Sequence, residues 1–132
     1  MPLPRLILLV LAVLMCSAFW ASSGQTQARR DDAPPYEQDL MRLSEILGAL
    51  HFLRPLCGAE DSPSWRTQME DLLESETEDE NRRRRFIERF NQGYRGFSAI
   101  YRDCTPSARL AMGQYIEEGG AIVTRVTSRF SR

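Results

Sequence analysis

The stretch TEDENRRRRFIERFNQGYRGFSAIYRDC, residues 77–104, predicts the helix around which we expect the rest of the fold to be organised. Its aromatic side chains fall three or four residues apart, at Phe86, Phe90, Tyr94, Phe97 and Tyr101. That spacing places them on one face of an α-helix, and such a face in a small helical protein is ordinarily buried. We therefore expect a central helix capped at Thr77, with the aromatic stripe in the hydrophobic core.

The charged start of the same stretch has two interpretations. Three acidic residues come first, and four arginines follow: Arg82, Arg83, Arg84 and Arg85. Glu78 with Arg82, and the next two pairs along, have the acid-first spacing that stabilises a helix, which favours a solvated, salt-bridged helix start. Alternatively, these arginines and Arg95 form a docking site for lipid or lipopolysaccharide phosphates, or for an acidic protein. They are the candidate partner-binding residues.

Two earlier segments show the same apolar periodicity. Residues 35–53 carry leucines at helical spacing. We expect this helix to stop before Pro55, because a residue that precedes proline disfavours helical geometry. Residues 63–75 repeat the pattern behind Ser62, which precedes a proline and is a typical N-cap. Both segments predict helices.

The last segment, 106–129, predicts a long helix that begins after Thr105 as its N-cap. Gly119 and Gly120 disfavour a continuous helix, and the β-branched residues after them favour a strand. No other segment offers a partner for such a strand, so a helix is the better prediction. Together the segments predict an all-α fold, a small bundle-like array of about four helices.

The N-terminal part of the chain predicts export. Residues 6–20 form an apolar run that is too short for a comfortable membrane span and fits the core of a secretory signal peptide. We expect residues 1–24 to be a signal peptide, 25–35 a polar tether and 36–130 a single helical domain in the periplasm. An uncleaved anchor is the alternative, and it would be the only membrane contact.

The cysteines agree with export. Cys57 and Cys104 are the two cysteines outside the apolar N-terminal run. Two cysteines of a small domain in an oxidising compartment usually pair, so we expect them to form a structural disulfide. A redox-active pair is the alternative, but catalytic dithiols usually lie close together in sequence, as in C-x-x-C.

The sequence offers little for catalysis or for a cofactor. His51 is the only histidine, so a zinc, copper or triad-type site lacks ligands, and the C-x-x-C-H motif of covalent haem is missing. A formal net charge of −1 gives no electrostatic basis for binding nucleic acid. We expect a protein that is not an enzyme, with no catalytic residues, no metal, no cofactor and no nucleic-acid partner.

Several short segments resemble a known family. They are PLCG around Cys57, FNQGYRGF at 90–97 and CTPSA at 104–108. Over residues 36–130 the chain resembles an uncharacterised family of small exported alphaproteobacterial proteins with two well-separated cysteines. The resemblance implies a periplasmic address and a disulfide, and it implies no activity.

Three functions remain open at this point. The first is a non-enzymatic interaction or accessory protein that acts on an envelope protein or a cell-wall component, which requires an exposed apolar or arginine-rich patch. The second is a helical periplasmic chaperone or envelope-stress protein, which requires a concave apolar surface. The third is a thiol-dependent enzyme, which requires free thiols or a buried carboxylate with a shifted pKa. We predict the first.

Overall fold

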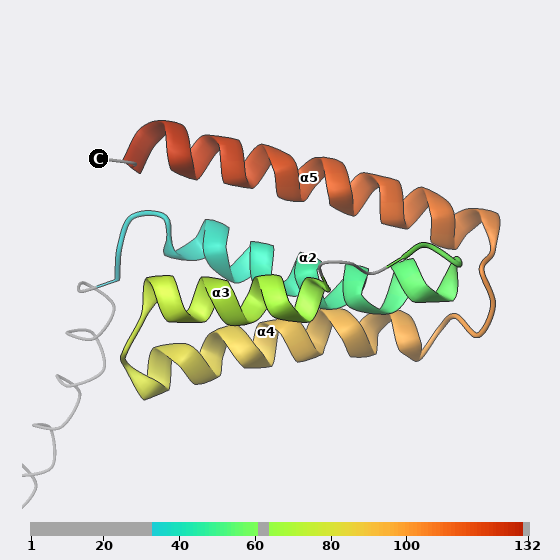
Figure 1. Ribbon diagram of the computed structural model, residues 1–132, viewed down its shortest axis with the longest axis horizontal. Coiled ribbons are helices and arrows are strands. Elements are labelled where there is room, and N and C mark those ends of the chain that lie inside the picture. The colour runs from blue at the N-terminus through green and yellow to red at the C-terminus, as the bar shows by residue number, and fades with distance from the viewer. Residues whose placement is uncertain (1–32, 61–63, 131–132) are drawn as a thin grey trace, which may run out of the picture. The chain divides into compact units, whose positions relative to one another are not determined.

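A computed structural model of the protein describes residues 33–60 and 64–130. The predicted signal peptide, 1–24, and most of the tether, 25–35, lie outside the described residues. The described chain contains four helices and no strand, which confirms the predicted all-α class (Figure 1). The helices are α2 (Glu37–Leu56), α3 (Trp65–Glu76), α4 (Glu80–Ser98) and α5 (Pro106–Phe130).

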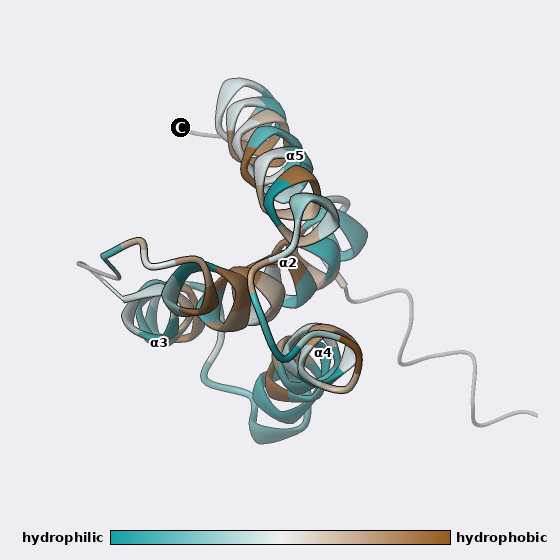
Figure 2. Cartoon of the chain, turned by 90° about the vertical axis from the view of Figure 1, so that its right-hand side faces the viewer, coloured by the Kyte–Doolittle hydropathy of each residue, from teal (hydrophilic) through white to brown (hydrophobic). Residues whose placement is uncertain are grey.

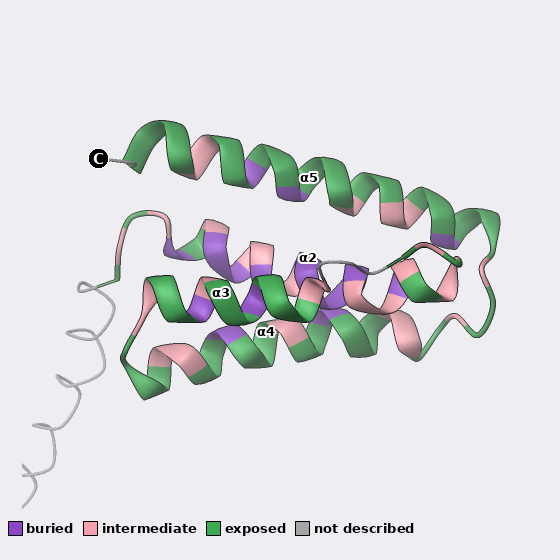
Figure 3. Cartoon of the chain, in the orientation of Figure 1, coloured by how far each residue is buried: buried purple, intermediate pink, exposed green. Residues whose placement is uncertain are grey.

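Helix α2 is the central helix, and the prediction that residues 77–104 form it is wrong. Each of the other three helices packs against α2 (Figure 2). Every residue from Ile46 to Leu50 is buried. By contrast, α4 is mostly exposed, and its buried residues are Phe86 and Gly93 (Figure 3). A helix that is apolar or small on all sides belongs in the interior. The core side chains that α2 supplies are Leu40, Met41, Ile46, Leu47, Ala49, Leu50 and Leu53.

The aromatic stripe of α4 enters the core only in part. Phe86 is fully buried, and Phe90 is half-buried and packs against the same cluster of side chains. Tyr94 keeps 38% of its surface exposed. Tyr101 lies beyond the helix, because α4 ends at Ser98. The predicted core role therefore holds for the first aromatic residues and weakens toward the C-terminal end.

The backbones of α2 and α4 touch at two glycines. A Cβ atom on Gly48 would lie 1.9 Å from the carbonyl oxygen of Phe90, and one on Gly93 would lie 1.9 Å from the carbonyl oxygen of Glu45. No side chain fits between backbones at that distance, so only glycine allows this contact. We call it the glycine crossing. Gly93 therefore marks a close approach of the two helices.

Helix α2 continues past its predicted stop, through Pro55 to Leu56. A proline in the last turn removes a single helical hydrogen bond, which is too little to end the helix there. The helix ends at Leu56 instead, and two residues later Gly58 reverses the chain with a φ of 71°. The N–H of Gly58 donates to the carbonyl of Pro55 and the N–H of Ala59 to that of Arg54, the Schellman pattern of a helix C-terminus.

The other three helices begin at side-chain caps. Ser64, Asp79 and Thr105 each accept a hydrogen bond from the backbone N–H three residues further along, at 3.1, 2.6 and 3.1 Å. Thr105 is the predicted cap of the last helix. The prediction of Thr77 as the cap of α4 is wrong by two residues. The predicted cap Ser62 lies outside the described residues.

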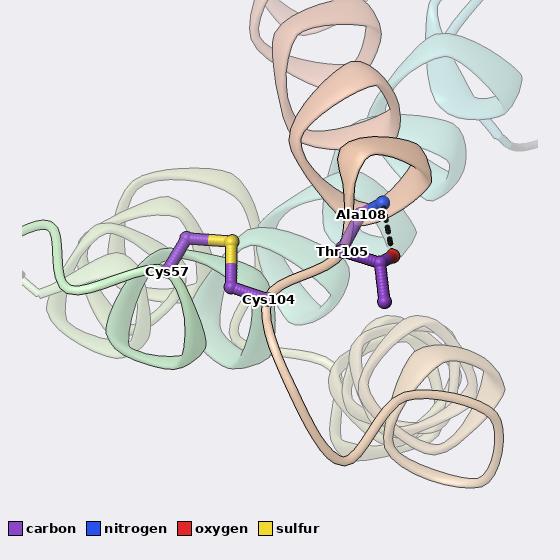
Figure 4. Close-up of a disulfide and its surroundings, with 4 residues drawn as sticks. All are labelled: Cys57, Cys104, Thr105 and Ala108. Atoms are coloured by element: carbon purple, nitrogen blue, oxygen red, sulfur yellow. Dashed lines mark hydrogen bonds between the residues drawn. A yellow bond between two sulfur atoms is a disulfide. The ribbon is translucent and has the colours of Figure 1, made fainter.

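A disulfide joins Cys57 to Cys104, as predicted, with 4.9 Å between the Cα atoms (Figure 4). It links the C-terminal cap of α2 to the segment between α4 and α5. The two cysteines are 47 residues apart in the sequence. Closing a loop of that length stabilises the fold by about 4 kcal/mol in the chain-entropy description.

Candidate functional site

Arg82, the first of the candidate partner-binding arginines, points inward and forms an ion pair with α2. Its guanidinium donates to the carboxylate of Glu37 at 2.6 and 2.8 Å, and also to the backbone carbonyl of Glu76. The Arg82 and Glu37 side chains keep only 14% and 9% of their surface exposed. This ion pair fastens the start of α4 to the first turn of α2.

The surroundings of Arg82 keep it charged. Burial lowers the pKa of its guanidinium, but the hydrogen bonds to Glu37 and the charges of Glu37 and Glu76 raise it, and the net pKa shift is upward. These two partners take the place of Glu78, the partner that helical spacing predicts.

The other arginines do not join Arg82 in a single surface. Arg84 and Arg95 are exposed, whereas Arg83 is half-buried. Arg85 lies 3.8 Å from a carboxylate oxygen of Glu37. The arginine run thus divides between intramolecular ion pairs and the outer side of α4, and the partner-binding role of its exposed members stays a prediction.

A groove lies between α3 and α5, and we call it the α3–α5 groove. Its volume is about 770 Å³, and α2 forms its floor. It exists because α3 and α5 each pack on α2 and, within the described chain, not on one another (Figure 2). The floor consists of Leu43, Ile46, Leu47 and Leu50, and the walls include Trp65, Asp71 and Leu72 from α3 and Tyr115, Ile116, Gly120 and Val123 from α5.

Tertiary contacts fix the two large aromatic side chains of the walls. The guanidinium of Arg54 lies over the Trp65 ring, 5.4 Å from its centroid. The Tyr115 ring meets the edge of the Phe97 ring at 5.3 Å between centroids. Aromatic and cation–π contacts of this kind stabilise the orientation of a ring, so the groove is largely pre-formed.

Helix α5 is exposed over most of its surface (Figure 3), and its flank beside the groove carries exposed apolar side chains. Ile116 and Val123 each keep 46% of their surface exposed. Gly113 and Gly120 share this flank, because they are seven residues, about two turns, apart. A Cβ atom on either glycine would meet nothing within 4 Å. Helix α5 runs unbroken through Gly120, as predicted, so these glycines neither end the helix nor make room for the rest of the domain.

The opposite flank of α5 is held to α2 by ion pairs. Arg42 donates to both carboxylate oxygens of Glu118, at 2.8 and 2.9 Å, and Arg125 donates to both oxygens of Asp39, at 2.7 and 3.1 Å. The hydrogen bond from Arg42 lowers the pKa of Glu118, and the one from Arg125 lowers the pKa of Asp39. One side of α5 is therefore held to α2 by ion pairs, and the other side presents an exposed apolar surface.

Sequence reasoning did not find the groove. The helical period left two choices open on the inner face of α5, Tyr115 or Ile116 and Ile122 or Val123. The structure buries Ile122 and exposes Ile116 and Val123. The sequence did carry a signal, namely that α5 has more apolar residues than one buried helix face can hold. Adjacent residues of a helix point in different directions, so one member of each pair had to lie outside that face.

The described residues form no evident metal site and no membrane-spanning helix. They contain no group of three or more His, Cys, Asp or Glu side chains placed to hold a metal ion. None of their helices is both long and apolar enough to cross a membrane. His51 packs against the rings of Phe90 and Tyr94, at 5.7 and 5.9 Å between centroids. The α3–α5 groove, by contrast, is a concave and mainly apolar surface of the described residues.

Comparison with curated proteins and with solved structures gave no match. A family model described as a protein of unknown function, DUF2385, matches residues 35–130. The matched region contains α2 to α5 and both cysteines of the disulfide. Since it covers well over half of the chain, the protein belongs to the DUF2385 family of proteins of unknown function.

Proposed function

We propose that this protein is a non-enzymatic interaction or accessory protein that acts in the periplasm, at the cell envelope, and binds its partner in the α3–α5 groove. The observation that carries this proposal is the apolar flank of α5. Ile116 and Val123 stay nearly half exposed beside a concave surface, although the core of the domain is complete without them. Exposed apolar surface in a concave setting is typical of a binding site.

The groove is a better binding surface than the arginine run. Arg82 is committed to Glu37, and Arg85 lies close to the same carboxylate. Of the four consecutive arginines, only Arg84 and Arg85 are exposed. By contrast, the volume of the groove lies within the range of about 300–1,000 Å³ that is common for ligand sites.

Two observations support a periplasmic location. The Cys57–Cys104 disulfide fits an oxidising compartment. Residues 1–24 have the pattern of a signal peptide. The mass of the protein isolated from the envelope tests both, since cleavage near Gly24 and a mass two hydrogens lower for the disulfide are expected. A cytosolic protein with free thiols would contradict the proposed location.

Site-specific crosslinking in living cells tests the groove. A photoreactive residue replaces Val123 in the groove or, as the matched control, the exposed Glu88 of α4. We expect a discrete crosslinked product from position 123, its loss on adding the substitution Ile116→Glu, and no such product from position 88. Equal products from both positions, or none from position 123, would contradict binding in the groove.

A helical chaperone is the second candidate, because the groove is the concave apolar surface that such a function requires. A chaperone would bind many unfolded chains and slow their aggregation, and Ile116→Glu would remove that effect. An accessory protein would leave the aggregation of unfolded proteins unchanged. Light scattering by a chemically denatured test protein separates the two candidates.

A further inference from the structure

We propose that the occupant of the α3–α5 groove is a short amphipathic helix of another protein, with small residues in its apolar stripe and basic residues along its flanks. This inference rests on the proposed function and names the chemistry of the partner. It follows from the dimensions of the groove, the backbone that α5 exposes there, and the charge of the rims.

The dimensions favour a helix. The lining runs from Trp65 to Ser75 on α3 and from Tyr115 to Thr124 on α5. At 1.5 Å per residue both walls are about 14–15 Å long, which corresponds to nearly three helical turns. An extended peptide is usually bound by adding a strand to a sheet edge, and the described chain has no strand. Two helical walls over an apolar floor instead match the helix-in-groove mode of recognition.

The exposed glycines of α5 favour close approach. Gly120 lines the groove, and Gly113 lies two turns earlier on the same flank. A glycine inside a helix destabilises the fold relative to alanine. The glycine crossing shows how this protein uses such residues, because Gly48 and Gly93 bring two helix backbones into contact. A partner helix with small residues could approach α5 in the same way between Ile116 and Val123.

The charges of the rims favour a basic partner. Asp71 is the only charged side chain among the described residues that line the groove. Glu74 and Glu117, which lie near the lining on α3 and α5, are exposed. Of the four acidic residues from Trp65 to Glu76, Glu70 pairs with Arg66 and Glu76 pairs with Arg82, so Asp71 and Glu74 are the ones left to meet a partner. Lysine or arginine on the flanks of a bound helix would face these carboxylates, and acidic flanks would be repelled.

Calorimetric titration with two designed peptides tests the proposal, using the exported protein purified from the envelope. Both peptides are helical, about 14 residues long, with the same alanine- and leucine-containing stripe, and their flanks carry either lysine or glutamate. We expect the lysine peptide to bind about five- to tenfold more tightly, because each exposed ion pair with Asp71 or Glu74 contributes only a modest attraction. That preference should decrease as the salt concentration rises.

Substitutions in the protein test which residues cause this preference for the lysine peptide. Asp71→Asn with Glu74→Gln should reduce the preference to less than about twofold, whereas the matched control Glu88→Gln on α4 should leave it unchanged. Gly120→Leu should weaken both peptides at least tenfold. Since nothing lies within 4 Å of a Cβ at that position, the variant is expected to keep its helical circular dichroism and thermal midpoint.

Each outcome supports or overturns the proposal. Equal binding of both peptides that Gly120→Leu abolishes would overturn the basic partner and leave the groove as the site. No peptide binding together with crosslinking from position 123 would overturn a helical partner. A dimer that sedimentation detects and Gly120→Leu dissociates would assign the groove to a second copy. If neither peptides nor crosslinks are found, the proposed function fails as well.

Discussion

Two pairs of glycines in this protein have the same helical setting and opposite surroundings. Gly48 and Gly93 lie where the backbones of α2 and α4 touch, and a Cβ atom on either would overlap a carbonyl oxygen at 1.9 Å. Gly113 and Gly120 of α5 face open space. The first pair is explained entirely by the fold. A Cβ atom on either residue of the second pair meets no neighbour within 4 Å, and under our proposal this open surface serves the partner of the α3–α5 groove.

The largest effect is expected at the glycine crossing. Gly48→Ala or Gly93→Ala should lower the free energy of unfolding by at least about 3 kcal/mol, because the methyl group forces α2 and α4 apart and Phe86 loses its packing. Denaturation in urea, followed by circular dichroism, measures the change. A loss below about 1 kcal/mol would mean that the two backbones can separate freely, and the contrast between the glycine pairs would disappear.

The arginines of α4 offer the same kind of comparison for side chains, because Arg82 is mostly buried in an ion pair and Arg95 is exposed. Arg82→Gln leaves the buried carboxylate of Glu37 without its main partner, and we expect the free energy of unfolding to fall by about 2–3 kcal/mol. Arg95→Gln, on an exposed residue of the same helix, should change it by less than about 0.5 kcal/mol. Urea denaturation of the two variants measures both values. Equal losses would show that burial of the ion pair does not matter.

On the exposed flank of α5, replacing a glycine should stabilise the protein instead of destabilising it. Gly120→Ala should raise the free energy of unfolding by about 0.5–1 kcal/mol, because alanine stabilises a helix relative to glycine and its methyl group meets no neighbour. Thermal denaturation measures the gain, with Gly113→Ala as a second instance. A loss of stability in either variant would indicate a contact inside the domain and would remove the argument for an external partner.

The sequence predicted the helices and the disulfide because both depend on local or sparse signals. Apolar periodicity and N-caps identified the four helical segments to within about three residues, except that α4 ends at Ser98, six residues before the predicted Cys104. Outside the apolar N-terminal run, Cys57 had only Cys104 to pair with. The central helix was misassigned because periodicity reports which face of a helix is apolar. It does not report how many neighbours cover that helix. In α2 the stretch from Ile46 to Leu50 is apolar or small on every side, and this sign of a central position was outweighed by the regular aromatic stripe of α4.

The candidate site was less predictable for a related reason. The arginine run is conspicuous in the sequence, but the partners of Arg82 lie on α2 and at the end of α3, and only the fold brings them together. The groove depends on α3 and α5 packing on α2 without contacting each other, a property of three helices at once. Whether Ile116 or Tyr115 lies on the inner face of α5 likewise depends on how that helix is rotated about its own axis in the fold.

The smallest expected effect concerns pH and the ion-paired flank of α5. The folded-state pKa values of Asp39 and Glu118 are lowered below their ordinary values of 3.8 and 4.5. As the pH falls through the ordinary range, the unfolded chain takes up protons first, so the stabilisation present at neutral pH is lost on acidification. Asp39→Asn with Glu118→Gln removes this contribution. The difference in unfolding free energy between the natural protein and the double variant should therefore be largest above about pH 5 and shrink toward pH 3.

Hydrogen exchange resolved by residue is the second measurement. In acid, the amides of α5 should lose their protection before those at the glycine crossing do. A difference that stays constant with pH would mean that these carboxylates do not hold α5, and that the buried residues Ala108, Gly119 and Ile122 hold it alone.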